Sequence, residues 1–161
     1  MKKIDAHHEG VYSADVFQVL IEYEISRSRR YPSPLALIEI VVKPVASHEA
    51  ALESAPATFL STLSHHLRSV DIPSKTGNVF KVLLPTTDEN GARAVCERLL
   101  SVFKNRFDSP NGFSIAFSLQ IGATVHAGGE TLSSAELFQK AEDALKQSKL
   151  KGPNTYVLLA Q

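Results

Sequence analysis

Cysteine, methionine and tryptophan are nearly absent from this chain. Its 161 residues include one cysteine, one methionine and no tryptophan. Because a single thiol has no partner within the chain, an internal disulfide is excluded, and the apolar neighbours of Cys96 predict a small buried side chain on a helix face. Neither sign of charge is in excess, since 17 basic residues balance 17 acidic ones. This balance argues against a nucleic-acid or membrane partner held by bulk electrostatics.

Long apolar runs are also absent. The most apolar stretch, residues 34–42, contains Glu39 and is far shorter than the roughly 20 residues that a membrane-spanning helix needs. The basic residues near the N-terminus are not followed by an apolar segment, so we expect no signal peptide, no membrane insertion and a cytoplasmic location. A content of 43% hydrophobic and 21% charged residues is typical of a globular protein, and the length predicts one domain over residues 1–161.

Hydrophobic periodicity predicts alternating helices and strands. The expected order is helix, strand, helix, strand, strand, helix, strand, helix, strand. The predicted helices begin after Ser13 and end near Arg30, cover residues 57–70, begin at a capping box at residues 86–89, and begin at Ser133 and stop at Gly152. The predicted strands are 35–42, the two arms of a hairpin within 71–85, 113–125 and 156–159. A hairpin combined with helical crossovers requires a sheet of mixed strand directions.

The hairpin is the most informative segment. Two extended apolar runs flank Thr76-Gly77-Asn78, residues that tolerate positive φ at the tip of a turn. The segment resembles the signature hairpin of diguanylate cyclases, the GGDEF domains, in which two glycines admit GTP phosphate and an acidic pair binds metal. In this chain the five signature positions read Thr76, Gly77, Asn78, Val79 and Phe80.

Other strings extend the resemblance to nearly the whole chain. Residues 9–17 look like the opening of the family, Arg29-Arg30-Tyr31 precedes the first strand as is usual there, and residues 141–145 followed by Lys149 look like its last helix. The resemblance implies an α/β (α+β) fold of the GGDEF or nucleotidyl cyclase palm type. In that fold a central mixed five-stranded sheet is flanked by helices and carries an antiparallel signature hairpin.

The departures from the family are concentrated where GTP and metal would bind. Glu39 occupies the place of the first metal-binding Asp of the first strand, and Val41 occupies the place of the second acid. Asn78 and Val79 replace the acidic pair of the hairpin, and an amide and an aliphatic side chain cannot hold Mg²⁺ as carboxylates do. The resemblance therefore implies a degenerate domain with no cyclase activity, no catalytic residue and no cofactor, in which Glu39 is a vestigial metal-ligand candidate.

A second motif of the family is retained. Arg68-Ser69-Val70-Asp71 matches the Arg-x-x-Asp inhibitory site through which many GGDEF domains bind cyclic di-GMP, and Arg98 lies where the family often has a further arginine. An arginine fork suits phosphate or a guanine edge, and an aspartate can accept hydrogen bonds from guanine. The resemblance thus implies a regulatory module that binds cyclic di-GMP through Arg68, Asp71 and Arg98.

Two other interpretations remain open on the sequence. Arg68 and Asp71 could form only a local ion pair at a helix end. The domain could also be a protein-interaction scaffold without a nucleotide, using an apolar surface such as that of the first helix, with a protein partner or a second copy of itself. Residual cyclase activity is the third alternative, and GTP turnover would reveal it.

Overall fold

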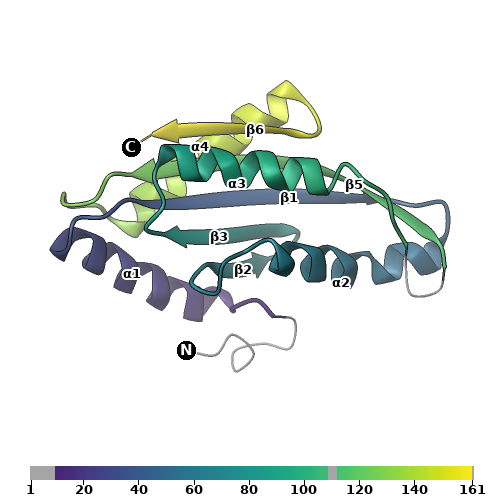
Figure 1. The fold of residues 1–161 in the computed structure, drawn as a ribbon, viewed down its shortest axis with the longest axis horizontal. Coiled ribbons are helices and arrows are strands. Elements are labelled where there is room, and N and C mark those ends of the chain that lie inside the picture. The colour runs from purple at the N-terminus through teal and green to yellow at the C-terminus, as the bar shows by residue number, and fades with distance from the viewer. Residues whose placement is uncertain (1–9, 109–111, 161) are drawn as a thin grey trace.

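The computed structural model describes residues 10–108 and 112–160. A sheet forms the centre of the fold, and helices lie along both of its faces (Figure 1). The helices in the described residues are α1 (Ala14–Arg30), α2 (Glu49–His65), α3 (Glu89–Val102) and α4 (Ser134–Lys151). The strands are β1 (Leu35–Val45), β2 (Ile72–Thr76), β3 (Val79–Pro85), β4 (Phe107–Asp108), β5 (Ser114–His126) and β6 (Thr155–Ala160).

The strand order places β1 at the centre of the sheet. The order is β2-β3-β1-β5-β4, and β6 pairs with β5. Among the described strands, every pairing is antiparallel except that of β5 with β6. The crossover through α2 therefore joins the parallel strands β1 and β2, with β3 between them, and the segment through α3 and β4 joins the parallel strands β3 and β5, with β1 between them. The mixed sheet expected from the sequence is confirmed, with the two-residue strand β4 as a sixth strand beyond the five expected.

Alternate residues of β1 belong to two separate cores. Ala36, Ile38 and Ile40 pack in the core that includes α2 and α3. Leu35 and Leu37 pack in the second core, with α1 and α4. Because both faces of β1 are covered, its sequence is almost continuously apolar instead of alternating. Cys96 lies on the buried face of α3 as expected, and burial raises the pKa of its thiol to about 12.

The second helix differs most from the sequence prediction. Residues 57–70 were expected to be helical, but α2 spans Glu49–His65 and contains Pro56. The proline suggested a boundary because it lacks an N–H donor, yet Ala51 and Ala55 precede it on the same buried face as Phe59. Packing of this face outweighs the lost hydrogen bond. Val70, expected on the buried face, lies beyond the helix and is 55% exposed.

Two smaller boundaries also differ from prediction. β1 continues to Val45 through Pro44, which is tolerated because beyond Val41 the strand pairs only with β5. Asp88, not the predicted Thr86, caps α3 by accepting a hydrogen bond from the N–H of Gly91. Ser13 and Ser133 cap α1 and α4 as predicted, the latter in a full capping box. Among the described residues, none of the helices combines the length and hydrophobicity that a membrane span requires.

Candidate functional site

The signature hairpin closes with two residues. Thr76 pairs with Val79, so Gly77 and Asn78 form the loop. Gly77 has φ +63°, whereas Asn78 is not among the described residues with positive φ. Positive φ at the first loop position alone is the pattern of a type II′ turn, which matches strand twist and favours glycine there. The predicted hairpin is confirmed, and its tip carries an exposed amide and no carboxylate.

Glu39 lies on β1 between Lys81 of β3 and Gly122 of β5 in the strand register. Its residue is only 5% exposed. Burial raises the pKa of the Glu39 carboxyl, and the nearby Glu142 acts in the same direction, while Lys81 and Lys149 oppose the shift. Val41, the other family acid position on this strand, is paired with Val79 of the hairpin. Lys81, Lys149 and Glu142 are thus the charged groups that act on the Glu39 carboxyl, and Asn78 and Val79 of the hairpin add no carboxylate to them.

The raised pKa of Glu39 predicts a pH-dependent effect of its removal. Glu39→Gln is expected to stabilise the fold at neutral pH, because the folded state then no longer buries a charge. The raised folded-state pKa means that the wild-type chain loses stability as pH rises above the ordinary value of 4.5. The gain from Glu39→Gln should therefore shrink as pH falls to that value, which urea unfolding at several pH values can measure. An equal gain at all pH values would contradict this assignment.

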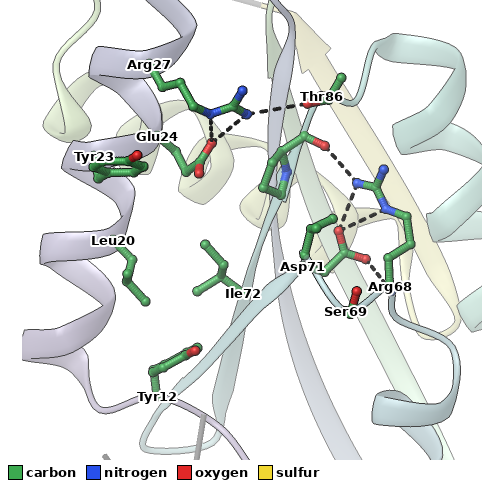
Figure 2. A pocket seen from close by; sticks show the side chains of 12 residues that line it. Tyr12, Leu20, Tyr23, Glu24, Arg27, Arg68, Ser69, Asp71, Ile72 and Thr86 are labelled. Atoms are coloured by element: carbon green, nitrogen blue, oxygen red, sulfur yellow. Dashed lines mark hydrogen bonds and ion pairs between the residues drawn. The ribbon is translucent and has the colours of Figure 1, made fainter. Parts of the chain in front are cut away.

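Arg68 and Asp71 meet in the loop between α2 and β2 (Figure 2). One oxygen of Asp71, Oδ2, accepts a hydrogen bond of 2.7 Å from the backbone N–H of Arg68. The other, Oδ1, accepts from Nε at 3.2 Å and from Nη2 at 2.9 Å. The same Nη2 donates to the carbonyl of Pro85 and to Oγ1 of Thr87, each at 2.8 Å. Arg68 thus links its own loop to the last residue of β3 and to the segment that follows it.

The two members of this pair differ in accessibility. The Asp71 side chain is 2% exposed, whereas that of Arg68 is 50% exposed. Among the described residues, Nη1 of Arg68 has no hydrogen-bond partner, so this nitrogen is left for an external acceptor. The local ion pair considered from the sequence is therefore present. Arg98, on α3, donates from its Nη2 to the carbonyl of His66 at 2.9 Å, two residues before Arg68.

A cavity of about 660 Å³ opens beside Arg68 and Asp71. Tyr23 and Arg27 of α1 line the same cavity, and Figure 2 shows the Arg27 side chain extending toward Thr86. Arg27 is paired with Glu24 at 2.9 Å and lies 3.5 Å from Oγ1 of Thr86. Arg98 is not part of the lining. The volume lies within the range of roughly 300–1,000 Å³ that is usual for ligand pockets.

Neither Tyr23 nor Arg27 was expected at this site from the sequence. Arg27 was interpreted as one of several cations that favour the C-terminus of a helix, and the structure does place it in the last turn of α1. Its sequence distance from Arg68 gives no signal of proximity. The signal in the sequence was indirect, because the first helix has more apolar residues than one buried face needs. The structure leaves one of these, Tyr23, 65% exposed.

Comparison with known proteins identifies the fold. The family model described as "Diguanylate cyclase, GGDEF domain" matches residues 57–155. The GGDEF domain of YfiN (TpbB) from Pseudomonas aeruginosa is 17% identical, with a TM-score of 0.80 over 92% of this chain and 96% of that one. A search of curated proteins found no match.

Two further solved structures illustrate the contexts of similar domains. Diguanylate cyclase SiaD of Pseudomonas aeruginosa, solved with its activator SiaC, is 18% identical, with a TM-score of 0.79 over 99% of this chain and 63% of that one. The coiled coil and GGDEF domain of DgcB from Caulobacter crescentus, solved with c-di-GMP, is 13% identical, with a TM-score of 0.76 over 95% and 83%. The family match spans more than half of the chain and agrees with the sheet order, the hairpin and the flanking helices, so this chain belongs to the GGDEF domain family.

Proposed function

We propose that this chain is a catalytically inactive GGDEF domain that serves as a regulatory module. The observation that supports inactivity best is the hairpin tip, where Asn78 and Val79 occupy the acidic positions of the family. Phosphoryl transfer between nucleotides needs divalent metal held by several oxygen ligands. Of the acid positions in β1 and the hairpin, only Glu39 is a carboxylate, and its burial favours the neutral form, which is a poor metal ligand.

Cyclic di-GMP is the ligand that we propose for the cavity beside Arg68. The Nη1 group of Arg68 can donate to a phosphate or to a guanine edge while Nε and Nη2 remain bound within the protein. Tyr23 adds an exposed aromatic ring on which a guanine can stack. Asp71 then acts mainly by holding Arg68 in position. Direct contact of the ligand with Asp71 or Arg98 stays a prediction, and it requires Asp71 to exchange a bond that it now makes with Arg68.

The charges around the cavity limit how much long-range electrostatic attraction can contribute to binding. Arg27 is paired with Glu24, and Arg68 is paired with Asp71, so two cations are balanced by two anions. Attraction of a dianionic ligand by a net positive field is therefore small. Directed hydrogen bonds and stacking carry the proposed affinity, and we expect a weaker dependence on salt than for a basic groove.

Calorimetric titration of cyclic di-GMP into the purified chain tests this proposal. We expect saturable binding to the wild-type protein, and affinity lower by about tenfold or more in Arg68→Ala, because a charge-assisted hydrogen bond is lost. Arg93→Gln is the matched control, since it removes one charge from the exposed side of α3, where Arg93 pairs with Glu89, and should leave binding unchanged. GTP with Mg²⁺ should give no heat.

An absence of heat with cyclic di-GMP would contradict the ligand assignment and favour the second candidate function, a protein-interaction scaffold. One observation supports that alternative. Val19 and Tyr23, one turn apart on α1, are 64% and 65% exposed, and Tyr31 just beyond the helix is also 65% exposed. An apolar stripe of this kind suits a second copy of the chain or a protein partner.

A further inference from the structure

A second cavity lies beside the tip of the signature hairpin. Its volume is about 160 Å³, and its walls come from β1, α2, the hairpin and β5. Val42, Ala55, Phe59, Phe80, Phe117 and Lys75 contribute to the lining. None of these residues lines the cavity beside Arg68, so the two spaces are independent.

The walls of this cavity are largely apolar and aromatic. Phe59 is at the centre of the aromatic cluster, with its ring centroid 4.8 Å from that of Phe80 and 5.7 Å from that of Phe117. All three are buried. An apolar cavity of about 150 Å³ is known to hold one benzene molecule and to exclude water. The space at the hairpin tip therefore has the size of one aromatic ring, and its walls offer tilted ring contacts.

Lys75 places a positive charge at this otherwise apolar space. Its Nζ lies 5.6 Å from the centroid of the Phe80 ring, and Lys75 makes no ion pair with any described residue. An adjoining pocket is lined by both Glu53 and Lys75. The two side chains are too far apart to form an ion pair. The exposed amide of Asn78 also borders the cavity. A ligand with an apolar ring and an anionic substituent matches the apolar walls and the positive charge of Lys75.

We propose that the cavity at the hairpin tip binds a single-ring aromatic carboxylate. The ring of the ligand lies in the cavity against Phe59, Phe80 and Phe117, and its carboxylate accepts a hydrogen bond from Lys75. The loss of acids from the hairpin makes this anion acceptable, because neither Asn78 nor Val79 carries a charge that would repel it. This site shares no lining residue with the proposed cyclic di-GMP site, so each of the two proposals can be tested without the other.

Benzoate is the probe for this site. It is titrated to millimolar concentration into the full chain carrying labelled methyl groups, and the signals of Val42 and Ala55 are followed by NMR. We expect saturable shifts at these two residues. Lys75→Gln should weaken binding by about fivefold, the effect of one partly exposed ion pair. Benzyl alcohol, which keeps the ring and lacks the charge, should bind the wild-type chain about as weakly as benzoate binds the variant.

Lys81→Gln is the matched control, because Lys81 belongs to the same hairpin but its Nζ lies over the ring of Phe138 at 4.7 Å, on the other face of the sheet. It should leave benzoate binding unchanged. Ala55→Leu fills the cavity and should abolish the shift at Val42. If that variant fails to fold, the comparison of Lys75→Gln with Lys81→Gln still tests the proposal. The absence of a saturable shift in the wild-type chain, or equal weakening in both lysine variants, would overturn the proposal.

Discussion

Gly122→Ala is expected to lower the free energy of unfolding by about 3 kcal/mol or more. A Cβ at Gly122 would collide with the backbone N of Leu145 and would lie 2.6 Å from the carbonyl oxygen of Ala141. Both atoms belong to the backbone of α4, so no flexible side chain can move aside. The whole helix must shift from β5, and its buried residues Leu137 and Ala144 would lose their packing.

Urea unfolding of Gly122→Ala measures this effect, and Gly77→Ala is the matched control. Gly77 has φ +63°, but an added Cβ there meets nothing within 4 Å. Its substitution should cost only the roughly 1–2 kcal/mol of a left-handed residue. If Gly122→Ala is no more destabilising than Gly77→Ala, the close approach of α4 to β5 is not a constraint on this fold.

Gly122 also links the helix packing to the candidate site. It pairs directly with Glu39 across the sheet, and Glu142 and Lys149 of α4 both act on the Glu39 carboxyl. The absence of a side chain at residue 122 lets α4 approach the sheet and bury this acid. The close packing of α4 on β5 therefore also sets the electrostatic environment of Glu39.

Arg68→Ala is expected to lower the free energy of unfolding by about 2 kcal/mol, apart from any effect on ligand binding. The variant leaves Asp71, whose side chain is 2% exposed, with only the backbone hydrogen bond to its Oδ2. It also removes the bonds to Pro85 and Thr87 that join two loops. Because Arg68 itself is half exposed, we place the cost below that of breaking a fully buried ion pair.

Thermal and urea unfolding of Arg98→Ala provides the comparison. Arg98 donates one hydrogen bond to an exposed segment, so its removal should cost less than about 0.5 kcal/mol. Equal small losses in the two variants would contradict the structural role assigned to Arg68. The comparison also shows whether the Arg68→Ala protein is folded under the conditions of the cyclic di-GMP titration.

Local sequence patterns were sufficient for most of the fold. Ser13 and Ser133 marked two helix starts, Gly77 and its flanking apolar runs marked the hairpin, and the continuous apolar run in β1 indicated a strand covered on both faces. Pro56 misled the placement of α2, because local propensity disfavours a proline that tertiary packing of Ala51, Ala55 and Phe59 accommodates.

The candidate site was less predictable from sequence. The motif located Arg68 and Asp71, but their burial and their bonds to Pro85 and Thr87 depend on contacts between segments distant in the chain. Arg27 and Tyr23 reach the same cavity only because α1 packs beside β2. The aromatic walls of the second cavity likewise come from α2, β3 and β5, so no local pattern could reveal them.

The most direct test of the central claim is an assay for cyclic di-GMP formation from GTP. The full chain is incubated with GTP and Mg²⁺ or Mn²⁺, products are separated by chromatography, and an active diguanylate cyclase is assayed in parallel. We predict no cyclic di-GMP above the no-protein background, because Asn78, Val79 and Val41 supply no metal-binding carboxylate beside Glu39. Product that accumulates in proportion to protein, and that disappears in Glu39→Gln, would contradict the account.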